Sequence, residues 1–354
     1  MHTNFSTLRF LSLLTILLLM PVAALAQDAR TSLANLPDAD VLIYVSPQKI
    51  LNDAAPRLMP PAELAKMRAS FADLKKDVGF DPSNVQYLVI ALRFNKPAGD
   101  LSFVAPDVLA VVGGDFNANA LFSLAELTLQ NRVRTEKHGS KTIALMKVDP
   151  IAAQAEKMPM LKSLSEIGGV VLNDNTLAIG NLPYLKSAVE AAEGTGRINI
   201  ATLDSLMRDP NALIAASGAP LASFAKAIGL FGTENTPRDS RCDTAFGNFY
   251  AAVTMLGTNF NVRGAMNADN PDTAKIISGL LATLMQQGIN AVPDKQAQSV
   301  LQSIKMTPRE NEIVWEADIP EQAIADLFKP ADKPSNVAPK PATRRKPVRR
   351  KRTR

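Results

Sequence analysis

The sequence predicts an α+β fold made of two tandem copies of a β-α-β-β-α-β-β-α-like unit, with largely antiparallel sheets and helices packed on one face. Three observations support this prediction. Short apolar strands alternate with amphipathic helices along the chain. Tight turns join neighbouring strands, which is typical of antiparallel pairing. The order of elements in the first half, residues 27–197, recurs in the second half, residues 198–328.

The first half begins with an apolar strand, Val41–Val45, which ends at Ser46-Pro47. Pro60-Pro61 then begins a helix whose apolar residues recur at steps of three and four, a spacing that predicts one buried stripe. Gly79 is suited to end this helix, because glycine adopts the left-handed conformation of a C-cap. The stripe consists of Leu64, Met67, Phe71, Leu74 and Val78.

Further strands and helices complete the first half. The turns at residues 138–140 and 173–175 contain Gly and Asn, which tolerate positive φ. The predicted elements are strands over 85–94 and 108–113, a helix over 118–129, hairpins over 132–148 and 168–179, and a helix over 184–192.

The second half repeats this order. Asn211–Ser217 matches Asp40–Ser46 in pattern. Asp318-Ile319-Pro320 matches Asn181-Leu182-Pro183, where a capping Asx precedes a helix-opening proline. Identity between the halves is low, so the predicted duplication depends on order and spacing; the alternative is that strand-to-helix turns use few residue types. The other elements are a helix over 221–231, strands over 246–255 and 259–266, a helix over 273–287 with Ile276, Ile277 and Leu280 on its apolar face, a hairpin over 303–318 and a helix over 320–328.

Two motifs near the start of the chain carry a family resemblance. Leu36-Pro37-Asp38-Ala39-Asp40 precedes the first strand, and Gly79-Phe80-Asp81-Pro82 follows the amphipathic helix. With these motifs, about the first seventy mature residues resemble uncharacterised exported bacterial proteins of the DUF3352-like kind. Both motifs are caps and turns, and the resemblance implies no reaction, ligand or site.

Residues 1–26 have the pattern of a cleaved export signal. Arg9 precedes an apolar run over residues 10–20, and Ala24-Leu25-Ala26 supplies the small residues that a signal peptidase recognises. A transmembrane anchor is the alternative, but the run is short for one. We therefore expect a mature chain that begins at Gln27 and is secreted or periplasmic.

The net charge of +5 conceals a sharp division. Residues 329–354 contain eleven Lys and Arg against one acid, Asp332, while residues 27–328 carry an excess of acids. Five prolines and no aromatic residue predict that this tail is disordered. We expect it to bind anionic polymers or a membrane surface, and a solubilising tail without a partner is the alternative. The predicted polyanion-binding residues are Arg344, Arg345, Lys346, Arg349, Arg350, Lys351, Arg352 and Arg354.

The sequence lacks the residues that several common kinds of catalytic, metal and cofactor site require. Cys242 is the only cysteine, which excludes an intramolecular disulfide and a cysteine-based zinc site. Once the signal is removed, His138 is the only histidine, and it falls in a predicted turn without partners for a triad. The sequence contains no Walker loop, dinucleotide fingerprint or nucleophile elbow. We expect no cofactor, and the sequence favours a non-enzymatic protein.

One spacing matches a calcium-binding loop, with oxygen ligands at positions 1, 3, 5, 9 and 12. Position 6 is Ala120 where the loop requires glycine, and the preceding element is a strand rather than a helix. Helix capping by short polar side chains is the alternative. The weak metal candidates are Asp115, Asn117, Asn119 and Glu126, with Ser123 at position 9.

The sequence thus predicts an exported, non-enzymatic envelope or extracellular protein that binds a partner or serves a structural role. Its tail would contact anionic envelope polymers, and its body an unidentified protein or small ligand. One alternative is an exported hydrolase that uses two carboxylates in an acidic cleft between the halves. Another is a polyanion-binding or nucleic-acid-binding protein that acts through the tail.

Overall fold

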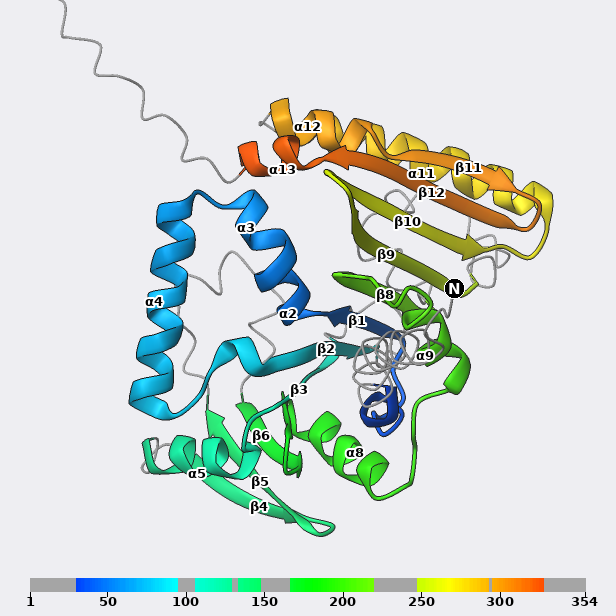
Figure 1. Cartoon of the computed structure of the whole chain (residues 1–354). Helices are drawn as coiled ribbons and strands as arrows, with labels where there is room; N and C mark the ends of the chain where they lie inside the picture. Colours follow the sequence, from blue (N-terminus) through cyan, green and yellow to red (C-terminus); the bar gives the residue numbers. More distant parts are fainter. Residues whose placement is uncertain are drawn as a thin grey trace, which may run out of the picture.

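The described strands of this protein form one antiparallel sheet. The computed structural model describes residues 30–94, 106–128, 133–147, 166–219, 247–292 and 295–327. Within them, twelve strands have the order β11-β12-β10-β9-β8-β1-β2-β3-β7-β6-β5-β4, and every neighbouring pair is antiparallel (Figure 1). The predicted α+β class and the antiparallel sheet are confirmed.

The elements have the following bounds. The strands are β1 Val41–Val45, β2 Val85–Arg93, β3 Asp107–Gly114, β4 Val133–His138, β5 Lys141–Lys147, β6 Glu166–Asn173, β7 Thr176–Gly180, β8 Ile214–Gly218, β9 Phe249–Leu256, β10 Asn259–Asn267, β11 Lys305–Arg309 and β12 Glu312–Pro320. The helices are α2 Pro47–Lys49, η1 Ile50–Ala54, α3 Ala55–Leu58, α4 Pro61–Val78, η2 Pro82–Asn84, α5 Ala118–Thr128, α8 Leu182–Ala192, α9 Ile200–Leu206, α11 Pro271–Ala291, α12 Lys295–Gln302 and α13 Glu321–Leu327.

The two halves of the chain meet at the pair β1 and β8, where Ile43 lies opposite Ala216. Outward from this pair the order is β1-β2-β3-β7-β6 on one side and β8-β9-β10-β12-β11 on the other, and β5 and β4 extend the first half. An internal duplication requires such a shared order; the duplication itself stays a prediction. The halves contribute to one sheet, because the edge strand of each pairs with that of the other.

Strand β8 begins later than the predicted match of residues 211–217 with residues 40–46 implies. This strand begins at Ile214, two residues later than its alignment with β1 requires. The cause is a turn at Asp209, whose side chain accepts from the Asn211 N–H at 2.9 Å and whose carbonyl accepts from the Ala212 N–H at 3.2 Å. The turn occupies residues that would otherwise extend the strand.

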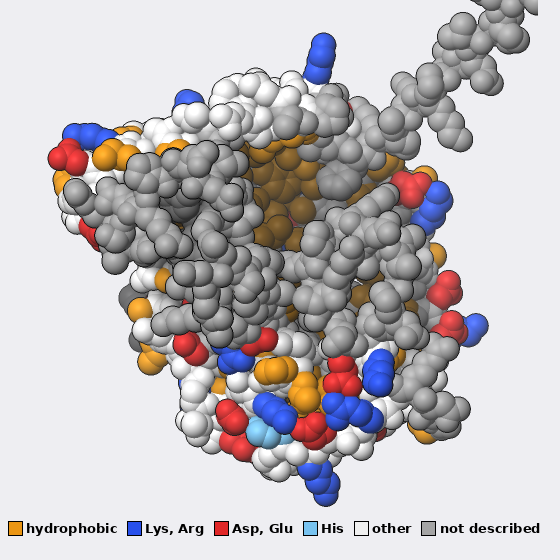
Figure 2. Space-filling view, turned by 180° about the vertical axis from the view of Figure 1, so that it is seen from behind, with side chains coloured by type: hydrophobic (Ala, Val, Ile, Leu, Met, Phe, Trp, Pro, Cys, Tyr) orange, Lys and Arg blue, Asp and Glu red, His pale blue; other side chains and the backbone are white. Residues whose placement is uncertain are grey.

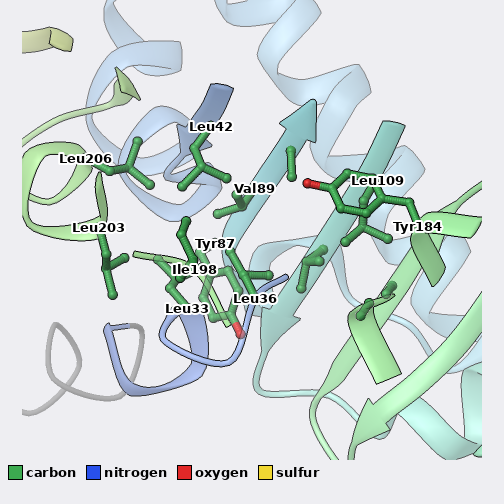
Figure 3. Packing of buried hydrophobic residues seen from close by; sticks show 14 of the residues in the cluster. Leu33, Leu36, Leu42, Tyr87, Val89, Leu109, Tyr184, Ile198, Leu203 and Leu206 are labelled. Carbon is green, nitrogen blue, oxygen red and sulfur yellow. The ribbon is translucent and has the colours of Figure 1, made fainter. Parts of the chain in front are cut away.

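The largest core lies on one face of β1, β2 and β3, beneath α8 and α9 (Figure 3). Strand β2 alternates buried and half-buried residues, as a pleated strand does when it rests on a core. Tyr87 and Val89 lie on that face, and Tyr184 and Leu185 of α8 cover it. Figure 3 labels Leu33, Leu36, Leu42, Tyr87, Val89, Leu109, Tyr184, Ile198, Leu203 and Leu206 of this cluster.

Helices cover both faces of the sheet, where the sequence predicted one. A Cβ on Gly168 would meet Leu185 of α8, whereas a Cβ on the next residue, Gly169, would meet Phe122 of α5 at 3.8 Å. Since consecutive strand residues face opposite sides, α5 and α8 lie on opposite faces. The reason is the composition of β6, which is apolar without interruption over residues 167–172, so both of its faces need cover.

Helix α4 forms as predicted, but its apolar stripe is not buried. Gly79 caps the helix at φ 70°, in the left-handed conformation. No residue of α4 is buried, and Leu74 and Val78 are each 37% exposed. Figure 1 shows α4 at the edge of the molecule, away from the sheet. The predicted burial is therefore wrong: the amphipathic spacing correctly gave a helix but not a covering element.

The apolar face predicted for residues 273–287 is also narrower in the structure. Ile277 of α11 is 5% exposed and packs with Ile313 of β12, whereas its neighbour Ile276 is 72% exposed. A helix turns 100° per residue, so one of two adjacent isoleucines can leave the contact surface.

The matched Asx-Pro segments differ between the halves. Asp318 and Pro320 are the last residues of β12, and α13 begins only at Glu321. Asn181 does precede α8, but its side chain makes no capping hydrogen bond and accepts instead from the Val108 N–H at 2.9 Å. Neither Asx residue therefore caps a helix as the sequence predicted.

Candidate functional site

A cavity of about 380 Å³ lies where the two halves meet. The segment α2-η1-α3 of the first half forms one wall. The approach to β8 and the β9–β10 turn of the second half form the other. Junctions of this kind are common positions for ligand sites. The lining residues are Lys49, Asn52, Asp53, Pro56, Arg57, Asn211, Leu213, Met255 and Gly257.

The wall from the first half contains a π-helical turn, η1, between two short α-helical segments. The N–H of Ala55 donates to the carbonyl of Ile50, five residues earlier, instead of four. Pro56 explains the position of this turn, since it has no N–H to donate to the carbonyl of Asn52. The α-helical spacing resumes where the Met59 N–H donates to Ala55 at 2.9 Å. π-turns of this kind are rare and often lie at functional sites.

Two cations line the cavity, and backbone carbonyls of the second half hold both of them. The ammonium of Lys49 donates to the carbonyl of Pro210, and the guanidinium of Arg57 donates to the carbonyl of Gly257. Burial lowers the pKa of Lys49, while Asp209 and Asp53 act in the opposite direction. A carbonyl positions a cation without neutralising it, and Arg57 in addition forms an ion pair with Glu321 at 3.7 Å.

The cavity rests on a packed apolar floor. Ala54 of η1 is 3% exposed and Leu213 is 5% exposed, and both belong to one cluster with Phe260 and Ile319 of the second half. Ile50 joins the same cluster. The π-turn is thus fixed between the halves, which makes the lining side chains preorganised.

A second polar cluster lies at the ends of β2 and β3, and its groups are mutually satisfied. Asp107 is 7% exposed; its Oδ2 accepts from Arg93 Nη2 at 2.9 Å and its Oδ1 accepts from the Asn181 amide. Arg93 also donates to Ser187 Oγ at 3.0 Å, and its guanidinium carbon lies 4.5 Å from the centroid of the Tyr184 ring. Polar groups that satisfy one another in this way hold the fold together and leave little binding capacity.

The calcium candidates lie at the start of α5, where two of them make capping or turn contacts. Asn117 Oδ1 accepts from the Ala120 N–H at 2.9 Å, which is an N-cap interaction. Asn119 donates to Asp174 Oδ1 at 3.2 Å across the β6–β7 turn. Among the described residues, no three His, Cys, Asp or Glu side chains gather in a way that would hold a metal ion. Capping thus accounts for these contacts, and calcium binding at Asp115 and Glu126 stays a prediction.

The histidine candidate packs against α8. The β4–β5 hairpin turns at Gly139, whose φ of 56° confirms the predicted turn. His138 Nε2 lies 3.0 Å from Glu190 Oε1, and Glu193 Oε1 accepts from the Ser140 N–H at 2.8 Å. His138 therefore links the hairpin to α8, with its side chain 28% exposed.

Other sequence candidates lie outside the described residues: the export signal over 1–26, Cys242, and the basic tail with all of its predicted polyanion-binding residues.

Within the described ranges, no helix is both long and apolar enough to traverse a bilayer. Figure 2 shows the molecule from behind, with apolar side chains lining a hollow in the upper half and charged side chains of both signs in the lower half.

The sequence predicted a cleft between the halves only for the hydrolase alternative, and it did not identify the residues that line the junction cavity. Its only local signals were Pro47 and Pro56 bracketing a short segment that contains Lys49 and Asn52. The partner residue Asn211 is far away in the chain, and nothing in its own surroundings indicates that it lies against this segment.

Known proteins show only distant structural likenesses to this chain. No protein-family model matches this sequence, and no curated protein matches it. The structure is similar to the treponemal protein TP0453 in crystal form III, with a TM-score of 0.46 and 10% identity over 83% of this chain and 96% of that chain. Crystal form I of TP0453 gives a TM-score of 0.41 and 9% identity over 83% and 95% of the two chains. Crystal form IV of TP0453 gives a TM-score of 0.42 and 9% identity over 84% of this chain and 96% of that chain. The DUF3352-like resemblance stays a prediction.

Proposed function

We propose that this chain is an exported, non-enzymatic binding or structural protein of the bacterial envelope or extracellular space, held near anionic polymers by its basic tail. The charge division carries the proposal: eleven Lys and Arg against one acid in residues 329–354, beside a body with an excess of acids. Each basic residue near an anionic surface contributes up to about 1 kcal/mol. A dense run of them supplies an attachment that needs no folded site.

The described body supports a non-enzymatic role. Its buried acid, Asp107, is engaged by Arg93 and Asn181 and cannot serve as a free general acid or base. A carboxylate hydrolase would need two carboxyl groups facing one cleft, at separations of about 5–10 Å. The junction cavity is lined by a single carboxylate, Asp53, together with two cations. Its lining therefore lacks the second carboxyl group that a glycosidase requires.

The test is cosedimentation of the purified chain with anionic phospholipid vesicles at low and at physiological salt. We expect weak binding that falls as salt rises, since the Debye length is about 8 Å at physiological ionic strength. Truncation after Phe328 should abolish binding and leave the melting temperature nearly unchanged.

A matched pair of variants locates the attachment. Replacing Arg349, Arg350 and Lys351 by Gln should weaken binding more than replacing the dispersed Lys329, Lys333 and Lys340 by Gln, because charge density sets the local potential. Equal binding by the full and the truncated chain at low salt would contradict the proposal. Tighter binding to double-stranded DNA than to vesicles at the same salt would favour the nucleic-acid alternative.

A further inference from the structure

The junction cavity has features of a binding site in its own right, separate from the tail. It lies between two halves that a packed cluster holds in place, and its wall contains the π-turn η1. Its volume of about 380 Å³ falls at the lower end of the range for small-molecule sites, which is about 300–1,000 Å³. A ligand of this site is therefore small.

The charge of the lining indicates an anion. Lys49 and Arg57 contribute two positive charges, and Asp53 contributes one negative charge. Arg57 Nη1 also forms an ion pair with Glu321 Oε2 at 3.7 Å, and Asp209 acts on Lys49, so acids outside the lining compensate part of both charges. Each cation keeps N–H donors beyond the one that it gives to a backbone carbonyl. The lining side chains by themselves carry a net charge of one positive unit, so a ligand with a single carboxylate suits these donors better than a dianion.

The remaining lining residues indicate a ligand with an apolar part. Leu213, Met255 and Pro56 provide carbon surface. Asn52 and Asn211 provide amides beside the cations, and such groups can donate to carboxylate oxygens. A planar guanidinium matches the geometry of a carboxylate, to which it can donate two parallel hydrogen bonds.

We propose that the junction cavity binds a small monocarboxylate with a short alkyl chain, with Lys49 and Arg57 contacting the carboxylate and Leu213 and Met255 contacting the chain. This goes beyond the tail-based function, which requires no ligand in the body. The two proposals can fail separately, because one concerns residues 329–354 and the other the described body.

The test is calorimetric titration of the purified chain, tail included, with sodium hexanoate at constant ionic strength. We expect saturable binding at one site. Hexanamide, which has the same shape without the charge, should not bind measurably. Inorganic phosphate, an anion without an alkyl chain, should bind at least about tenfold more weakly than hexanoate.

Matched variants assign the site. Lys49→Met keeps most of the side chain but removes a charged donor, so hexanoate affinity should fall by at least about tenfold. Lys66→Met removes an exposed lysine of α4, which pairs with Glu63 at 2.7 Å, and should leave affinity unchanged. Truncation after Phe328 should also leave it unchanged, whereas it abolishes vesicle binding.

Asn211→Asp supplies a second variant in case Lys49→Met fails to fold, which circular dichroism reports. It places a negative charge in the lining with little change of shape and should likewise weaken hexanoate binding. The proposal is overturned if the unmodified chain shows no saturable binding up to about 10 mM hexanoate. It is also overturned if Lys66→Met weakens binding as much as the cavity variants do.

Discussion

Replacing Asp107 by alanine should destabilise this protein by about 3 kcal/mol. The Asp107 carboxylate accepts two hydrogen bonds from Arg93, at 2.9 Å from Nη2 and 3.3 Å from Nε, and one from the Asn181 amide. Its removal leaves the guanidinium and the amide without their acceptor in a part-buried position.

The magnitude follows from how much water can reach the freed groups. Breaking a fully buried ion pair costs about 3–5 kcal/mol, and losing a hydrogen bond to a charged group costs about 1.5–3 kcal/mol. The Arg93 side chain is 31% exposed, so water can partly solvate it after the change. This places the loss of unfolding free energy near the lower end of the first range.

Urea unfolding followed by far-UV circular dichroism measures the loss, provided that the transition is two-state. The matched control is Glu316→Ala, which removes the exposed pair with Arg309 at 3.7 Å and should cost less than about 0.5 kcal/mol. The double variant Asp107→Ala with Arg93→Met should lose less than the sum of the single losses, since the uncompensated charge is absent. Equal losses from Asp107→Ala and Glu316→Ala would refute the reasoning.

Three further changes test local packing and turns. Gly264→Ala should cost about 1–3 kcal/mol and shift tryptophan fluorescence, because a Cβ there would lie 2.2 Å from the Trp315 ring; an unchanged urea midpoint would count against it. The hydrogen bond from the Ser140 N–H holds the pKa of Glu193 below its ordinary value. The bond therefore stabilises the turn fully at pH values above the ordinary pKa of a glutamate, and this stabilisation is lost as the pH falls through the lowered pKa. Amide exchange at Ser140, corrected for its intrinsic pH dependence, should report that loss, and Glu193→Gln should remove it. Gly79→Ala should cost about 1–2 kcal/mol in the same urea titration from backbone strain alone, since φ is 70° and no neighbour lies within 4 Å; a stability gain would exclude that explanation.

Local signals predicted most elements. The strand over residues 41–45 has the predicted bounds, and the turn at 173–175 joins β6 to β7 as expected. Short segments were missed: α9, Ile200–Leu206, and α12, Lys295–Gln302, are too short for a periodic pattern to stand out. Helices of this length are marginal alone and depend on tertiary contacts. In α9, burial of Leu203 and Leu206 in the main core provides them.

The candidate site was less predictable than the fold. The metal candidates at the start of α5 rested on a spacing of oxygen side chains, and the same side chains suit a helix N-terminus. Two of them, Asn117 and Asn119, are engaged by Ala120 and Asp174. Spacing along the chain cannot distinguish these outcomes, because both use short side chains with oxygen acceptors at close intervals.

The sequence by itself determined the α+β class, the antiparallel hairpins and the charge division between body and tail, because each depends on residues close together in the chain. Only the tertiary structure decided that β1 pairs with β8 to make one sheet, that no residue of the apolar stripe of α4 is buried, and that Lys49 and Asn211 line one cavity. These outcomes depend on which strand edges and helix faces come into contact once segments far apart in the chain have been brought together. The free energy of such contacts is shared between distant segments, so no local spacing encodes it.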